Sequence, residues 1–119
     1  MSKIMTIEDS AFERKAIINM LAKGNYKEVV EAETGEEGIE LFKKEKPDLV
    51  LLDLRLPGMD GIECFKKLKK EDPRVKVIIV SIVTRQESVD ECMKLGAKAY
   101  IMKPVTQKKL LDPIKTILK

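Results

Sequence analysis

Residues 49–52, Leu-Val-Leu-Leu, form an unbroken apolar run that stops abruptly at the carboxylate of Asp53. A short run of this kind suits a strand buried on both faces of a parallel sheet better than a hairpin strand with one wet face. Ligands of open α/β sheets bind outside the carboxyl ends of the strands, so a lone charge at that position is a candidate functional group. The segment from Pro47 to Gly61 is therefore the predicted centre of the structure.

Apolar strand patterns alternate with helix patterns along the rest of the chain. The predicted strands are residues 3–8, 28–32, 48–53, 75–81 and 99–102. Each is followed by a helix-capping residue, with Glu three positions later at the first four, and these caps are Ser10, Thr34, Asp60, Thr84 and Thr106. Right-handed crossovers between such units give a doubly wound α/β fold, in which a parallel five-stranded sheet of order 2-1-3-4-5 carries five helices on its two faces.

Pro113 conflicts with the last predicted helix, which runs from Thr106 to Lys119. Proline removes one backbone donor from a helix interior. We therefore expect this helix to kink, or to restart with Asp112 as its cap and Pro113 in the first turn.

Length and composition limit the possible functions. The 119 residues suffice for one core, so we expect a single domain over residues 1–119. The net charge is only +3 and the basic residues are dispersed, which argues against direct nucleic-acid binding. No run approaches the roughly 20 apolar residues of a membrane span, and the N-terminus lacks a signal-peptide core. These features predict a cytoplasmic protein without membrane insertion.

Two residue types bear on catalytic and metal chemistry. The chain has no histidine, which removes the commonest general base and metal ligand. Cys64 and Cys92 lack metal-type spacing, so we expect reduced thiols in helices.

The predicted topology brings Glu8, Asp9, Asp53, Ser81 and Lys103 to one edge of the sheet. Three neighbouring carboxylates repel one another and need a cation or a raised pKa. Mg²⁺ fits, with Asp9 and Asp53 as direct ligands and Glu8 acting through water. A lysine and a hydroxyl beside the metal suit the oxygens of a transferring phosphoryl group. Asp53 would then be the nucleophile that forms an aspartyl phosphate.

These residues resemble those of the receiver domains of two-component response regulators, and the length is similar to that of stand-alone chemotaxis receivers (CheY-like). The matching motifs cover the whole chain and are Glu8-Asp9, Asp53 in Leu-Leu-Asp-Leu-Arg-Leu-Pro-Gly-Met-Asp-Gly, Ser81, and Lys103-Pro104. The resemblance implies a signalling domain rather than a conventional enzyme. Such a domain catalyses its own phosphorylation, here on Asp53, from the phosphohistidine of a cognate histidine kinase or phosphotransferase.

The same resemblance assigns ligands for the metal and the phosphoryl group. It implies Mg²⁺ held by Asp9, Asp53 and the backbone carbonyl of Arg55, and a phosphoryl group bound by the Ser81 hydroxyl and the Lys103 ammonium. It also implies a cis peptide bond between Lys103 and Pro104, an isomer that costs little only before proline.

The resemblance also implies how a signal leaves the domain. Tyr100 matches an aromatic switch whose ring turns inward when Ser81 is drawn toward the phosphate. A shift between pre-existing states would then alter a face that binds an output protein, in a monomer or a phosphorylation-dependent dimer. That face comprises the helix over residues 84–96, the strand over 99–102 and the helix from 106 to 119.

Two positions depart from the family pattern. Glu8 stands where aspartate is commoner, and its longer side chain should still reach the water shell of the metal. Ile82 stands where receivers usually carry a small residue, so its β-branched side chain would narrow access to Asp53.

Several alternatives follow from these residues. Ile82 motivates a receiver that works mainly unphosphorylated, as a docking or dimerising module. The chain would equally suit a receiver excised from a longer response regulator.

An aspartyl-phosphate phosphohydrolase is disfavoured because Arg55 stands where a second acid would protonate the leaving group. A flavin-binding module is disfavoured because the first loop has Glu8-Asp9 in place of a phosphate cradle.

Overall fold

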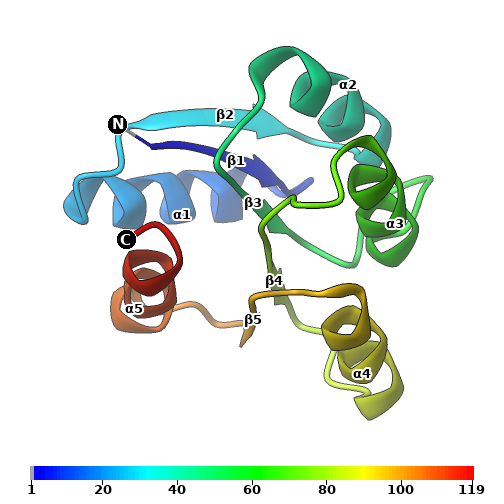
Figure 1. Ribbon diagram of the computed structural model, residues 1–119. Helices are drawn as coiled ribbons and strands as arrows, with labels where there is room; N and C mark the ends of the chain where they lie inside the picture. The colour runs from blue at the N-terminus through cyan, green and yellow to red at the C-terminus, as the bar shows by residue number, and fades with distance from the viewer. Residues whose placement is uncertain (1) are drawn as a thin grey trace.

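A computed structural model describes residues 2–119 as five strands that alternate with five helices (Figure 1). The strands are β1 (Lys3–Ile7), β2 (Glu28–Ala32), β3 (Leu49–Leu52), β4 (Val77–Ser81) and β5 (Ala99–Met102). The helices are α1 (Ala11–Lys23), α2 (Gly35–Glu45), α3 (Gly61–Glu71), α4 (Gln86–Leu95) and α5 (Gln107–Ile117). All strand pairs are parallel, in the order β2-β1-β3-β4-β5, so the predicted doubly wound fold is confirmed.

The central strands β3 and β4 are apolar, apart from Ser81 at the end of β4, because each faces a core on both sides of the sheet. Val50 and Leu52 of β3 enter a core covered by α2, α3 and α4. Leu49 and Leu51 enter a second core, covered by α1 and α5. Every residue of both strands is buried, which explains why neither shows the alternation of a half-exposed strand.

Three strands are shorter than predicted. Glu8 and Asp53 lie just beyond β1 and β3, where their side chains leave the sheet for the carboxyl-end cleft. At the start of β4, the Val75 amide donates to the Asp72 carbonyl at 3.0 Å, which holds Val75 in a turn.

Four of the five predicted helix caps are confirmed. The side chains of Ser10, Thr34, Asp60 and Thr106 each accept a hydrogen bond from the amide three residues later. The prediction for Thr84 is wrong, because α4 begins at Gln86 with Arg85 as a cap that makes no side-chain bond. Val83 is held by Ser81 and Tyr100, and the backbone is still extended at Arg85, so the helix cannot begin directly after Thr84.

Helix α5 does not restart at Pro113. The helix runs unbroken from Gln107 to Ile117 and contains the proline. Leu110, Leu111 and Ile114 are buried on both sides of it, so packing holds the two halves of the helix together.

Cys64 and Cys92 are both buried free thiols. Among residues 2–119 the structure has no helix long and apolar enough to cross a bilayer.

Candidate functional site

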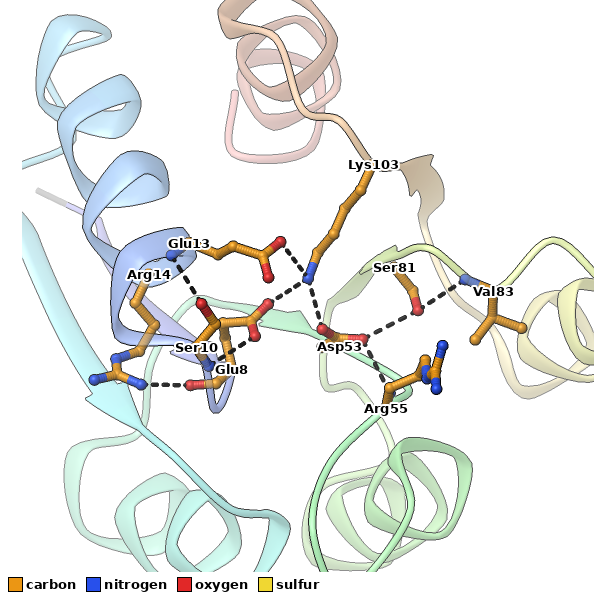
Figure 2. A network of polar contacts seen from close by, with 9 residues as sticks. All are labelled: Glu8, Ser10, Glu13, Arg14, Asp53, Arg55, Ser81, Val83 and Lys103. Atoms are coloured by element: carbon orange, nitrogen blue, oxygen red, sulfur yellow. Dashed lines mark hydrogen bonds and ion pairs between the residues drawn. The ribbon is translucent and has the colours of Figure 1, made fainter.

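Four of the side chains predicted to be functional gather around the Nζ atom of Lys103, at the carboxyl edge of the sheet (Figure 2). Glu8 follows β1, Asp53 follows β3, Ser81 ends β4, and Lys103 follows β5. Lys103 Nζ donates to Glu8 Oε1 at 2.6 Å and to Asp53 Oδ2 at 2.7 Å. The structure thus brings these four residues together at the edge where sequence reasoning placed them.

Asp53 is held by donors on both carboxylate oxygens. Oδ2 pairs with Lys103, while Oδ1 accepts from the Arg55 amide at 2.9 Å and from Ser81 Oγ at 3.0 Å. The residue is only 5% exposed. These donors fix the orientation of the Asp53 carboxylate at the base of a cleft.

Burial in this arrangement raises the pKa of Glu8. It is 3% exposed, and burial raises the pKa of its carboxyl to about 7, with a further increase from Asp53. Hydrogen bonds from Lys103 and from the Ser10 amide, at 3.0 Å from Oε2, act in the opposite direction on that pKa. Burial outweighs them, so Glu8 gains a proton far more readily than an exposed glutamate.

Lys103 remains a cation in this setting. Burial by itself lowers the pKa of its ammonium, but hydrogen bonds to Asp53, Glu8 and Glu13 outweigh burial and raise that pKa above its usual 10.5. A positive charge is therefore fixed 2.7 Å from Asp53 at neutral pH.

A cleft of about 510 Å³ opens above Asp53. Asp9 is exposed and lines this cleft together with Asp53 and Arg55. Within residues 2–119, no three acidic or cysteine side chains converge as a metal cluster, and Lys103 Nζ lies between Glu8 and Asp53. The oxygen donors of Asp9, Asp53 and the Arg55 backbone nevertheless share one cleft, and Mg²⁺ commonly needs only one or two carboxylates plus waters.

Ile82 also lines the cleft above Asp53 and is 52% exposed.

Tyr100 is half-buried and its hydroxyl donates to the Val83 carbonyl at 2.6 Å. The Val83 amide in turn donates to Ser81 Oγ at 3.2 Å. A continuous set of hydrogen bonds therefore joins Asp53 to Tyr100 through Ser81 and Val83. The peptide bond between Lys103 and Pro104 is cis.

Sequence reasoning missed two residues of this site, Glu13 and Arg14. The sequence pattern indicates Glu13 only as the partner of the Ser10 cap, but its Oε1 lies 2.9 Å from Lys103 Nζ. Helix α1 begins directly after the first loop, so its first turn faces the same cleft as Glu8. That short connection was the available signal.

Arg14 is the second residue that was missed. It is 8% exposed and donates to the Glu8 carbonyl oxygen at 2.7 Å and to the carboxylates of Glu31 and Glu33 at 3.0 and 3.3 Å. Its position in line with the buried Ile17 and Leu21, three and seven residues later, indicated an inward-facing side chain. Arg14 thus fixes the backbone at Glu8, in the loop between β1 and α1.

Comparison with known proteins agrees with this geometry. The sequence profile described as "Response regulator receiver domain" matches residues 4–115. The chain is 33% identical to the chemotaxis protein CheY of Thermotoga maritima over 117 residues, 98% of each chain. It superposes on a CheY-like receiver domain protein of Methanospirillum hungatei with a TM-score of 0.93 and 34% identity, covering 99% of this chain and 94% of that one.

A third relative is a complex. The chain superposes on the structure of the CheX-CheY-BeF3-Mg complex from Borrelia burgdorferi with a TM-score of 0.94 and 28% identity, over 99% of this chain and 90% of that one. Family profile, relatives and fold therefore agree that this chain belongs to the response regulator receiver domain family, as a CheY-like receiver of two-component signalling.

Proposed function

We propose that this receiver takes a phosphoryl group onto Asp53 from the phosphohistidine of a partner histidine kinase or phosphotransferase. One carboxylate oxygen of Asp53 attacks phosphorus, the phosphorus–nitrogen bond breaks, and its electron pair returns to the imidazole of the donor. The observation that carries this proposal is the buried Asp53 carboxylate, which lies at the base of an open cleft with Lys103 Nζ 2.7 Å away. The domain would catalyse its own modification and act as a signalling protein.

Lys103 and Ser81 supply the charge and the hydroxyl that the transfer requires. Both already contact Asp53, at 2.7 Å and 3.0 Å. Charge that develops on the phosphoryl oxygens would find a fixed ammonium and a hydroxyl donor next to it, so little reorganisation would be needed. This positioning is the main catalytic contribution expected of a protein in phosphoryl transfer.

Asp9, Asp53 and the backbone carbonyl of Arg55 would hold Mg²⁺, with Glu8 acting through water. Their hard oxygen donors line one cleft, which suits this ion. Bound Mg²⁺ would neutralise negative charge on the carboxylates and the phosphoryl oxygens. The Borrelia burgdorferi relative, whose structure holds BeF3 and Mg, supports this assignment.

Phosphorylation would change the face made by α4, β5 and α5. The hydrogen bonds that join Ser81, Val83 and Tyr100 provide a route, because a phosphoryl group that draws Ser81 toward Asp53 would release the Val83 amide. Tyr100 would then turn inward and shift the balance between two states of the face. An output protein would bind this face, on a monomer or a phosphorylation-dependent dimer.

We also propose that residues 1–119 act as one receiver domain in the cytoplasm.

Calorimetric titration with beryllofluoride and Mg²⁺ tests the acceptor role of Asp53. We expect the wild-type protein to bind beryllofluoride only with Mg²⁺ present, and Asp53→Asn to bind none. Asp48→Asn, at an aspartate on the opposite edge of the sheet, is the control and should bind normally. Equal binding by wild type and Asp53→Asn would contradict the proposal.

Amide chemical shifts measured in the same titration test the output face. Shifts should spread through residues 83–106 and leave α2 unchanged, because α2 packs against β2 and β1, at the other end of the strand order from β5. Shifts confined to the cleft would count against the switch and leave the phosphoryl-acceptor assignment standing.

One observation favours a second candidate, a receiver that works mainly unphosphorylated as a docking or dimerising module. Ile82 is 52% exposed on the wall of the cleft and restricts the approach to Asp53.

A further inference from the structure

Lys103 is surrounded by carboxylates (Figure 2). Its Nζ lies 2.6 Å from Glu8 Oε1, 2.7 Å from Asp53 Oδ2 and 2.9 Å from Glu13 Oε1. A lysine ammonium has three N–H donors and no acceptor. Lys103 donates hydrogen bonds to Glu8 and Asp53 and forms an ion pair with Glu13, so a phosphoryl oxygen on Asp53 can bind Lys103 only if one of these partners gives way.

The three carboxylates differ in how firmly they are held. The Glu8 side chain is 3% exposed and its second oxygen accepts from the Ser10 amide. The Asp53 side chain is 6% exposed and is fixed by Ser81 and Arg55. The Glu13 side chain is 43% exposed, and Lys103 is its one ion-pair partner within residues 2–119. Glu13 is therefore the carboxylate whose separation from Lys103 costs the least free energy, because water can solvate the exposed side chain.

We propose that Glu13 is the exchangeable partner of Lys103. It holds the ammonium while Asp53 is unmodified and gives its place to an oxygen of the phosphoryl group. This role rests on the phosphoryl-acceptor function proposed for Asp53. Glu13 does not touch the reacting atoms, so it is a positioning residue that acts through Lys103.

The exchange has a direct consequence for the signalling equilibrium. Glu13 and the phosphoryl group compete for the Lys103 ammonium, and both are anions. The cleft is already lined by Glu8, Asp9, Asp53 and Asp60, so the charge of Glu13 adds repulsion against an incoming anion. Glu13 therefore favours the unmodified receiver and sets how tightly a phosphoryl group, or its mimic, is held.

Substitution of Glu13 by glutamine removes this competition and leaves the helix cap in place. The Ser10 cap uses the backbone amide of Glu13, at 3.2 Å from Ser10 Oγ, and glutamine retains that amide. Glu40→Gln is the matched control: Glu40 is exposed, pairs with Lys43 at 3.3 Å on α2, and loses the same charge on substitution.

Beryllofluoride affinity at saturating Mg²⁺, measured by calorimetry at low salt, is the test. We expect Glu13→Gln to bind about two- to fivefold more tightly than wild type, the range typical of a single ion pair at a partly exposed site. Glu40→Gln should match wild type. The gain should shrink in 1 M salt, where the Debye length is about 3 Å, a response that a merely structural role for Glu13 would not produce.

The outcomes separate the two proposals. Wild-type binding with no gain for Glu13→Gln would overturn the exchange role and leave the function of Asp53 intact. A gain of the same size in Glu40→Gln would also overturn it, because net charge alone would then explain the effect. Failure of the wild-type protein to bind beryllofluoride would overturn both proposals.

Discussion

At the level of single residues, the site balances buried negative charge with one ammonium. Glu8 and Asp53 are 3% and 5% exposed, and both depend on Lys103. Buried charges cost free energy unless they are paired and hydrogen-bonded. Lys103 cannot fully compensate two carboxylates, so the remaining cost appears in the raised pKa of Glu8.

The pKa of Glu8 predicts how stability depends on pH without Mg²⁺. The folded protein keeps a proton on Glu8 up to about pH 7, whereas the unfolded chain releases it near 4.5. The folded state thus binds more protons across this window, so this group lowers the free energy of unfolding as pH rises through it. Wild type should lose roughly 1–3 kcal/mol more than Glu8→Gln between pH 5 and 8 in urea unfolding. Parallel profiles for the two proteins would contradict this assignment.

Ile82 predicts a gain in reactivity on truncation. Its side chain is 52% exposed on the cleft wall, so Ile82→Ala widens the approach to Asp53 and removes little buried surface. We expect phosphorylation by a small phosphodonor to accelerate by up to about tenfold, about 1.4 kcal/mol in the barrier. Stability should change by less than about 1 kcal/mol. Met93→Ala, at an exposed apolar residue of α4, is the control. An unchanged rate would remove the support for the docking candidate.

At the level of elements, the site depends on how closely α3 approaches β3. Gly61 is the first residue of α3, and its amide donates to the Leu54 carbonyl at 2.9 Å. A Cβ at this position would collide with the Leu54 backbone and lie 2.5 Å from the Asp53 carbonyl oxygen. The backbone that carries Asp53 leaves no room for a side chain there.

Gly61→Ala should therefore destabilise the protein by about 1–3 kcal/mol in urea unfolding and weaken beryllofluoride binding. Gly35→Ala is the matched control because Gly35 is also the first residue of its helix, α2. Its added Cβ would meet side chains and not backbone, namely Met59 Sδ at 3.2 Å and the Cys64 Cβ and Sγ atoms at 3.4 and 3.5 Å. Stability should then change by less than about 1 kcal/mol. Equal losses in the two variants would show that helix position, and not contact with β3, sets the requirement for glycine.

Helix boundaries were predictable where residues close together in the sequence determine them. Ser10, Thr34, Asp60 and Thr106 cap their helices through a bond to an amide three residues away, which sequence spacing reveals. The start of α4 depends instead on contacts that Tyr100 makes with Val83, from the next strand. Continuity of α5 through Pro113 likewise depends on packing against the sheet, which overrides the local preference of proline.

At the level of the whole molecule, the parallel order β2-β1-β3-β4-β5 is what assembles the site. It brings residues up to 95 positions apart, Glu8 and Lys103, within 2.6 Å. The sequence was sufficient for this grouping because the carboxyl ends of parallel strands share an edge. Glu13 and Arg14 escaped prediction because their partners, Lys103 and the Glu8 carbonyl oxygen, are set by the tertiary structure and not by spacing along α1.

Mass spectrometry of the protein after incubation with Mg²⁺ and a small phosphodonor tests the central assignment most directly. The intact wild-type protein should gain the mass of one phosphoryl group, and peptide mapping should place it on Asp53, the residue that Lys103 and Ser81 orient. Asp53→Asn should gain none. Absence of the modification in the wild-type protein, or its presence on another residue, would contradict the account.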